Sequence, residues 1–323
     1  MANISIVNYC NLKCPYCFSN DMISSDNNYT ITEQELENIL AFCSRTLEPV
    51  GIIGGEPTLH PSFKTILTQF KEYKLLNMSE RNVTLYTNGI ELEQYLDVED
   101  FYRYFGLLIN INHPDIMTNE QYNKTLKTLD RLKKDEAFGK VATIGCNFYP
   151  SRTDYQYIWD IINKYDIKEL RVSTVAPCKQ FESYRNKKDE YYIMMKEIFL
   201  NQCKLAEKYD VQLNLDCNNV PFCYYTDEEM EFIKSLNLSN NCDICEDPVL
   251  DVVFGHKISA CFGAYDLIEP SLFDFADIEA IKRYLRMYRI YPKIKNNGNG
   301  QCAECKRYKY TDCQGGCLAF ATE

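Results

Sequence analysis

Apolar segments with strand character alternate with amphipathic helical patterns through the first two-thirds of the chain, and this alternation constrains the fold more than any other feature. We expect strands at residues 4–7, 50–53, 83–86, 106–111, 141–148 and 169–174. We expect helices between them at residues 63–75, 120–134 and 155–164, and a longer helix around residues 190–209. Six strands separated by helices predict a parallel sheet with right-handed crossover connections.

The first helix has the clearest start signal. Residues 32–35 form a capping box, and apolar side chains then recur on one helix face through Cys43. Cys43 is therefore expected in the core, as are Cys146 and Cys203, which share faces with apolar neighbours. Cys178 follows the sixth strand, where it could face the ligand end of the sheet.

Three cysteines follow the first strand with the spacing C-x3-C-x2-C, at Cys10, Cys14 and Cys17. Three thiolates can hold three irons of a [4Fe–4S] cluster, which leaves the fourth iron open to a substrate or cofactor. The alternatives are a zinc site or structural cysteines. Zinc normally takes a fourth Cys or His at short spacing, and the nearest histidine is His60, so the spacing favours iron–sulfur.

The second strand ends in Gly54, Gly55, Glu56 and Pro57. Adjacent glycines let a ligand approach the backbone closely, and their carbonyl groups can accept hydrogen bonds from a cationic amine. The same four residues could form a simple turn. Their position one strand after the cysteine triplet favours a ligand contact.

Together the two motifs resemble the radical S-adenosylmethionine (SAM) superfamily. The resemblance implies that Cys10, Cys14 and Cys17 hold a [4Fe–4S] cluster and that SAM chelates its open iron. It also implies the other SAM contacts: the amino group at Gly54, Gly55, Glu56 and Pro57, the adenine beside Tyr16, the third strand end at Thr87 and Asn88, and the ribose at Asn110. The Asn110 position departs from the family pattern, although an amide side chain can still bind ribose hydroxyls.

The implied fold is α/β: a partial (β/α)6 TIM-like barrel over residues 1–210, followed by a small Cys-rich domain over residues 211–323. In parallel α/β folds, ligand contacts gather at the carboxyl ends of the strands. The cysteine loop and the ends of the second, third and fourth strands all lie at such positions. The expected cofactor site is therefore one edge of the sheet.

The last third of the chain contains nine of its sixteen cysteines. Clustered C-x2-C pairs indicate metal, and either thiolate-only zinc or iron–sulfur would satisfy the spacing. The pattern resembles the SPASM extension of radical SAM enzymes, which carries one or two auxiliary [4Fe–4S] clusters. By that resemblance the ligands are Cys242, Cys245, Cys261 and Cys317 for the first cluster, and Cys302, Cys305 and Cys313 for the second.

The second auxiliary cluster lacks a fourth cysteine in this assignment, because none follows Cys317. It could have an open iron, a ligand other than cysteine, or a ligand drawn from Cys217 or Cys223. Those two thiols could instead be the first ligands of the first auxiliary cluster, or buried structural residues.

Composition narrows the classes of binding partner and environment that we expect for this chain. The formal net charge of −11 disfavours nucleic acid, which normally requires a basic patch. No apolar stretch approaches 18 residues, so we expect no membrane span. Sixteen cysteines without a signal-peptide pattern favour metal clusters in a reducing cytoplasm over a disulfide scaffold.

The resemblance implies an enzyme that cleaves SAM reductively and uses a 5′-deoxyadenosyl radical to remove a hydrogen atom from its substrate. It implies a reductant such as ferredoxin or flavodoxin. Because SPASM enzymes commonly modify peptides or proteins, by crosslinking, thioether formation or side-chain oxidation, we expect a peptide or protein substrate. The alternatives are dehydrogenation or epimerisation of a small molecule, a non-catalytic iron–sulfur electron carrier or redox sensor, and a thiolate zinc protein.

Overall fold

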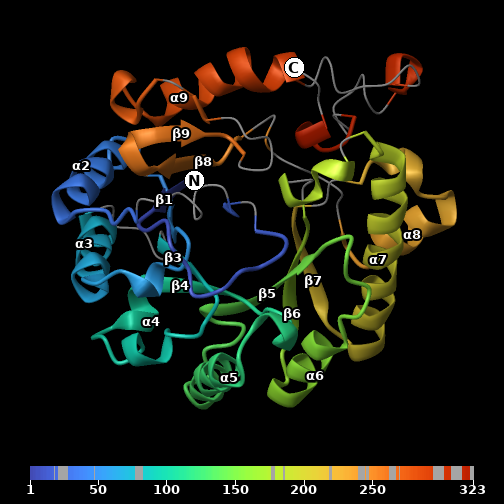
Figure 1. Ribbon diagram of the computed structural model, residues 1–323, viewed down its shortest axis with the longest axis horizontal. Helices are drawn as coiled ribbons and strands as arrows, with labels where there is room; N and C mark the ends of the chain where they lie inside the picture. Colours follow the sequence, from blue (N-terminus) through green and yellow to red (C-terminus); the bar gives the residue numbers. More distant parts are fainter. Residues whose placement is uncertain are drawn as a thin grey trace.

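All six predicted strands are present in the computed structural model of the chain, and they pair in chain order as one parallel sheet (Figure 1). Their bounds are β1 (Ala2–Ser5), β2 (Val50–Ile53), β3 (Val83–Thr87), β4 (Phe105–Asn110), β5 (Ala142–Phe148) and β6 (Glu169–Thr174). The register places Ile4 beside Ile52, and Ile52 beside Leu85. The expected α/β fold with a mostly parallel sheet is confirmed.

The structure describes residues 1–17, 19–20, 28–46, 48–76, 83–175, 179–184, 186–217, 220–238, 244, 247–261, 267–268, 270–293, 302–306 and 315–320. The predictions for Cys178, Cys242, Cys245 and Cys313 lie outside these residues. None of the helices in the described ranges combines the length and the apolar character needed to cross a membrane.

The sheet continues past the six predicted strands at both edges. On one edge β7 (Gln212–Cys217) pairs parallel with β6. On the other, β8 (Leu250–Val253) pairs parallel with β1 and leads to the antiparallel strands β9 (Lys257–Ser259) and β10 (Leu267–Ile268). Strands from both sides of the expected boundary at residue 211 thus share one sheet, and the boundary itself stays a prediction.

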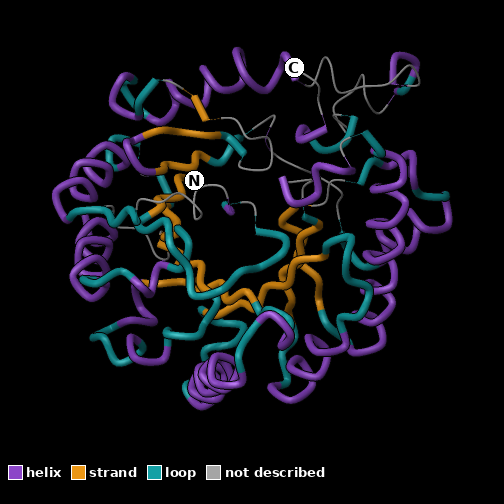
Figure 2. Tube along the Cα trace, in the orientation of Figure 1, coloured by secondary structure: helices purple, strands orange, loops and turns teal. Residues whose placement is uncertain are grey.

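Helices cover the outer side of the curved sheet, while the segment that follows β1 runs across the inside of the arc (Figures 1 and 2). The helices are α2 (Glu33–Cys43), α3 (Phe63–Leu76), α4 (Phe101–Tyr104), α5 (Asn119–Lys134), α6 (Gln156–Tyr165), α7 (Lys188–Tyr209), α8 (Asp227–Ser235) and α9 (Ile278–Leu285). The capping box predicted at the start of α2 forms, with Thr32 and Glu35 bonding each other's backbone N–H groups.

The hydrophobic core lies between the sheet and these helices. Alternate strand residues such as Ile4, Ile52 and Leu85 are buried in one continuous cluster with helix residues such as Leu36 and Ile66. The thiols predicted as core residues, Cys43, Cys146 and Cys203, are fully buried. The opposite strand residues face the inside of the arc, so the sheet presents a second surface that the helices do not cover.

Candidate active site

The cysteine triplet lies in the segment directly after β1, at the carboxyl end of the sheet, as predicted. The pKa of the Cys10 and Cys14 thiols is raised to about 12, mainly by burial and in part by the nearby Cys17 thiol. The three sulfur atoms are therefore close enough to influence one another electrostatically. Within the loop, the Leu12 N–H donates to Cys10 Sγ (3.4 Å) and the Cys17 N–H donates to the Cys14 carbonyl (3.1 Å).

This donor set fits an iron–sulfur cluster. Within the described part of the chain, no three His, Cys, Asp or Glu side chains converge on a point that one metal ion could occupy. A [4Fe–4S] cube has a different requirement, because each thiolate binds a separate iron corner. Three neighbouring, partly buried thiols on one loop meet that requirement, and iron binding would displace their protons.

The Gly54–Gly55 pair brings the end of β2 against the cysteine loop. The Gly55 N–H donates to the Val7 carbonyl (2.8 Å), and the Glu56 N–H donates to the Tyr9 carbonyl (2.9 Å). A Cβ atom on Gly55 would lie 2.1 Å from the Tyr9 carbonyl oxygen, so only glycine allows this approach. In the described structure, these glycines pack closely against the chain's own backbone beside Cys10.

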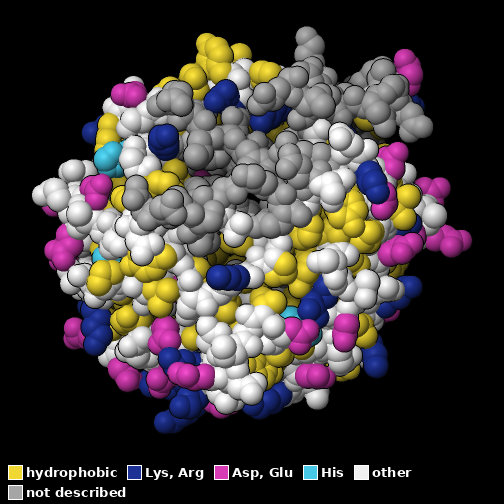
Figure 3. Space-filling view, viewed as in Figure 1, with side chains coloured by type: hydrophobic (Ala, Val, Ile, Leu, Met, Phe, Trp, Pro, Cys, Tyr) yellow, Lys and Arg dark blue, Asp and Glu magenta, His cyan; other side chains and the backbone are white. Residues whose placement is uncertain are grey.

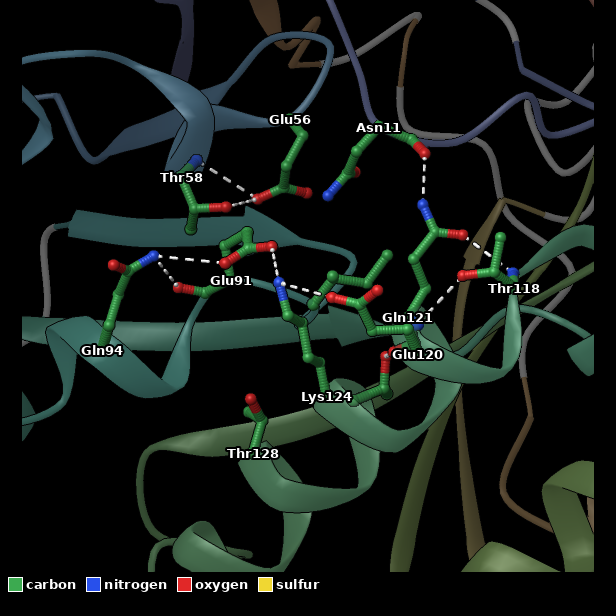
Figure 4. Close-up of polar contacts among 12 residues, drawn as sticks. Asn11, Glu56, Thr58, Glu91, Gln94, Thr118, Glu120, Gln121, Lys124 and Thr128 are labelled. Carbon is green, nitrogen blue, oxygen red and sulfur yellow. Dashed lines mark hydrogen bonds and ion pairs between the residues drawn. The ribbon is translucent and has the colours of Figure 1, made fainter.

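Glu56 is the one carboxylate of this motif and is buried, and Figure 4 shows its contacts with Thr58. It accepts hydrogen bonds from Thr58 Oγ1 (2.6 Å), the Thr58 N–H (3.2 Å), Thr87 Oγ1 (2.6 Å) and the Asn88 N–H (2.8 Å). Burial raises the pKa of the Glu56 carboxyl, and the donated hydrogen bonds oppose that effect. Glu56 therefore joins the ends of β2 and β3.

Asn88 connects the end of β3 to the cysteine loop. Its Nδ2 atom donates to Asn11 Oδ1 (2.7 Å) and lies 3.9 Å from Cys10 Sγ. Gln121, near the start of α5, reaches the same loop and donates to the Asn11 carbonyl (2.8 Å; Figure 4). Sequence reasoning missed Gln121, which in the structure also closes a capping box with Thr118 at the start of α5.

Tyr16 and Cys14 both contact Asn112, which lies two residues after β4. The Tyr16 hydroxyl and the Cys14 thiol donate to Asn112 Oδ1, the latter at 3.3 Å. Burial raises the pKa of the Tyr16 hydroxyl well above its ordinary value. The Tyr16 ring also packs on Tyr149, with ring centroids 4.8 Å apart.

Asn110, predicted as a ribose contact, lies on the inner face of β4. Its Oδ1 atom is 3.5 Å from Asn147 Nδ2. A Cβ atom added to Gly145 would lie 2.8 Å from the same oxygen. Two residues farther along the chain, Asn112 is the asparagine that touches the cysteine loop.

Six cysteines of the last third lie within the described residues, and two of them, Cys302 and Cys317, lie near Lys188 of α7. Both thiols influence the Lys188 ammonium electrostatically, as does Cys223, while burial lowers its pKa. Lys188 Nζ donates to the Gly315 carbonyl (3.3 Å), which anchors the terminal segment against α7. The structure thus brings Cys223 into the neighbourhood of two predicted auxiliary ligands. Cys261 and Cys305 are half-buried.

Residues 4–163 match the model of the Radical SAM superfamily. GTP 3′,8-cyclase of Synechocystis sp. is 34% identical over 95 residues, which is 29% of this chain and 28% of the cyclase. A probable GTP 3′,8-cyclase of Pyrococcus abyssi is 32% identical over 93 residues, 28% of this chain and 30% of that protein. The match therefore spans less than a third of each of these two cyclases.

Among solved structures, Streptococcus suis SuiB bound to the precursor peptide SuiA matches with a TM-score of 0.62 at 16% identity. The alignment covers 98% of this chain and 71% of SuiB. At this identity the likeness shows the fold, which extends over nearly the whole chain.

Proposed function

Because this chain carries a radical SAM domain, we propose that it is a radical SAM/SPASM enzyme that modifies a peptide or protein substrate. The observation that carries the proposal is the convergence on one loop of Cys10, Cys14 and Cys17 with the ends of β2, β3 and β4. An electron carrier needs ligands for its cluster, but it has no need of strand ends arranged around an open iron.

Cys10, Cys14 and Cys17 would hold the [4Fe–4S] cluster, and Gly54, Gly55, Glu56, Pro57, Tyr16, Thr87, Asn88 and Asn110 would bind SAM. When bound, the cluster supplies the electron that cleaves SAM to the radical that removes a substrate hydrogen atom. The chain's own contribution is positioning. The buried Glu56 carboxylate fixes Thr87 and the Asn88 N–H, and Asn88 in turn reaches the cysteine loop.

One or two auxiliary clusters are part of the proposal. Cys261, Cys302, Cys305 and Cys317 would be ligands, together with Cys242, Cys245 and Cys313. The proximity of Cys302 and Cys317 to Lys188 supports a thiolate site there, since an ammonium group stabilises nearby negative charge. Cys223 lies in the same neighbourhood, which supports it as the fourth ligand that the second auxiliary cluster lacks.

A peptide substrate is favoured by the breadth of the structural likeness. SuiB, which was solved with a precursor peptide, matches over 98% of this chain, whereas the Synechocystis cyclase matches over 29%. The second candidate is a small-molecule substrate, as the cyclase names indicate for those proteins. A cytoplasmic enzyme with a ferredoxin or flavodoxin reductant completes the proposal.

Anaerobic reconstitution tests the proposal. With iron, sulfide, dithionite and SAM, the wild type should bind iron and sulfide and form 5′-deoxyadenosine. Cys14→Ala should lose 5′-deoxyadenosine formation, and Cys203→Ala, which alters a buried thiol of α7, should retain it. A wild type that holds the clusters but forms no 5′-deoxyadenosine would favour the electron carrier, and one without iron and sulfide would favour zinc.

The substrate class requires a second assay. Candidate precursor peptides and small molecules are incubated with the reconstituted enzyme, and their masses are compared before and after reaction. A mass loss of about 2 Da in a peptide would support crosslinking or oxidation, since each removes two hydrogen atoms. Conversion confined to small molecules would support the second candidate.

A further inference from the structure

The inner face of the sheet is unusually polar for a parallel α/β protein. Closed barrels of this kind fill their interior mainly with bulky branched apolar side chains. Here the strand residues that alternate with the core positions include the apolar Ile53, Leu108 and Val253, but most of them are polar or glycine, such as Asn3, Gly51, Tyr86, Arg171 and Asp251. Polar groups are costly to enclose without partners, so this surface is suited to a polar ligand.

Asp251 and Asn3 form the most distinctive pair on this face. They are directly opposite each other in the β1–β8 pairing, and Asn3 Nδ2 donates to Asp251 Oδ1 (2.8 Å). Asp251 is only 6% exposed. The other polar atom of the amide, Asn3 Oδ1, is buried without a hydrogen-bond partner. A carboxylate and an unsatisfied amide oxygen therefore lie together.

Gly51 on β2 lets the Asn3 amide oxygen pack closely against the backbone of β2. A Cβ atom at that position would lie 2.2 Å from Asn3 Oδ1 and 2.9 Å from the Tyr86 ring. Asp251 and Arg171 on β6 both act electrostatically on the Tyr86 hydroxyl. The Tyr86 ring therefore lies on one side of the Asn3–Asp251 pair.

The chain's own cations near this region are bound elsewhere. The Met1 ammonium pairs with Glu48 (2.7 Å), and Lys282 pairs with Glu48 and Asp247 (2.8 Å each). Arg171 pairs with Asp216. Among the ion pairs of the described residues, none includes Asp251.

We propose that Asp251 and Asn3 form a subsite for a cationic group of the substrate, an ammonium or guanidinium. Both of these groups present several N–H donors, which match two adjacent oxygen acceptors. The subsite lies in the amino-terminal half of β1, away from the cysteine loop, so it binds a part of the substrate remote from the reacting carbon. This inference rests on the proposed function, and for a peptide substrate the group is a lysine or arginine side chain.

The test is binding to the reconstituted holoprotein at pH 8, where the Asp251 carboxyl is ionised, measured by fluorescence anisotropy. Four labelled heptapeptide pools share the same randomised flanks and have a fixed central Lys, Arg, citrulline or norleucine. The wild type should bind the Lys or the Arg pool about tenfold more tightly than the two neutral pools, equivalent to about 1.4 kcal/mol. Asp251→Asn should reduce that preference to near onefold.

Matched variants separate recognition from folding. Asp160→Asn changes an exposed carboxylate on α6 and should keep the preference. Asn3→Ala removes the amide oxygen and should weaken the preference while leaving Asp251 in place. A free-amine arm compares butylamine with butanol as competitors: competition by butylamine alone, lost in Asp251→Asn, would support the cation subsite and assign its ligand to a small molecule.

Equal binding of all pools without amine competition would overturn the inference. Absence of binding by every pool and by the amine, or a preference that persists in Asp251→Asn, would overturn it as well. Formation of 5′-deoxyadenosine is measured on the same samples without peptide. That measurement tests the proposed function separately, since it does not depend on the subsite.

Discussion

Replacing Asp251 with asparagine should stabilise the protein, and the gain should increase with pH. Burial raises the pKa of the Asp251 carboxyl from its ordinary 3.8 to about 7. The unfolded chain therefore releases this proton near pH 3.8, while the folded protein keeps it until about pH 7. Between these values the folded state binds more protons, so its stability falls as pH rises.

The size of the effect follows from the two pKa values. At about 1.4 kcal/mol per pKa unit, the raised pKa of this carboxyl destabilises the fold by about 2 kcal/mol at pH 5.5 and about 4 kcal/mol at pH 8. Asp251→Asn removes this penalty. Its oxygen can still accept the hydrogen bond from Asn3, and its new amide can donate to the buried Asn3 Oδ1.

The assay is anaerobic thermal unfolding followed by circular dichroism at both pH values. At roughly 2 °C per kcal/mol for a large domain, Asp251→Asn should raise the apparent melting temperature by about 4 °C at pH 5.5 and about 8 °C at pH 8. Asp160→Asn, on the exposed side of α6, should shift it by less than about 1 °C. An equal gain at both pH values, or a loss of stability at pH 8, would refute the reasoning.

Three further substitutions test the site and the core by thermal unfolding. Gly51→Ala should destabilise the fold by about 1–3 kcal/mol, because its Cβ would lie 2.2 Å from an amide oxygen. In the control Gly106→Ala the Cβ meets nothing closer than 3.6 Å, so this variant should cost less than about 1 kcal/mol. Similar costs for the two variants would contradict the packing argument. Glu56→Ala leaves four hydrogen-bond donors unpaired and should cost about 3 kcal/mol of stability. Glu56→Gln should cost less. An alanine variant with unchanged stability would show that water replaces the carboxylate. Lys282→Met should cost about 2 kcal/mol, which is below the roughly 3–5 kcal/mol of a fully broken buried pair. The cost is smaller because Glu48 keeps the N-terminal ammonium as an ion-pair partner. A stabilised variant would mean that the desolvation cost of Lys282 outweighs its pairing.

The strands and helices of the first two-thirds were predictable because local patterns determine them. The predicted strand 50–53 and the observed β2 are identical, and the helix predicted at 120–134 begins one residue earlier, at Asn119. The strands β7 and β8 were not predicted. Both pair with the edges of a sheet that is already formed, so their stability depends on partners distant in sequence, and periodicity does not report such partners.

The candidate site was predictable in its members but only partly in their arrangement. Spacing predicted Cys10, Cys14 and Cys17, and the family resemblance predicted Thr87 and Asn88. The saturation of Glu56 by four donors was not predictable, since two of the donors come from the neighbouring strand. A surface view shows acidic and basic side chains interspersed around the lower rim (Figure 3), so charge gives no further marker there.

On the polar inner face of the sheet, the buried Asp251 carboxyl lowers the stability of the fold. An asparagine at position 251 would preserve the contact to Asn3 without the cost of a buried charge, so a carboxylate there is not explained by stability. Groups with strongly shifted pKa values that lower stability are typical of binding and catalytic sites.

The cysteine loop combines local order with dependence on the cluster. Side chains or backbone groups from β2, β3, α5 and the end of β4 each contact it, and a hydrogen bond contributes about 1 kcal/mol. Ordering the segment from Cys10 to Cys17 costs on the order of 10 kcal/mol in backbone entropy. Hydrogen bonds alone therefore do not offset that cost, and the remainder has to come from packing and from iron–thiolate bonds. Assembly of the cluster and ordering of the loop are coupled for this reason, and the strand ends around the loop limit the arrangements in which the three thiolates can meet the iron.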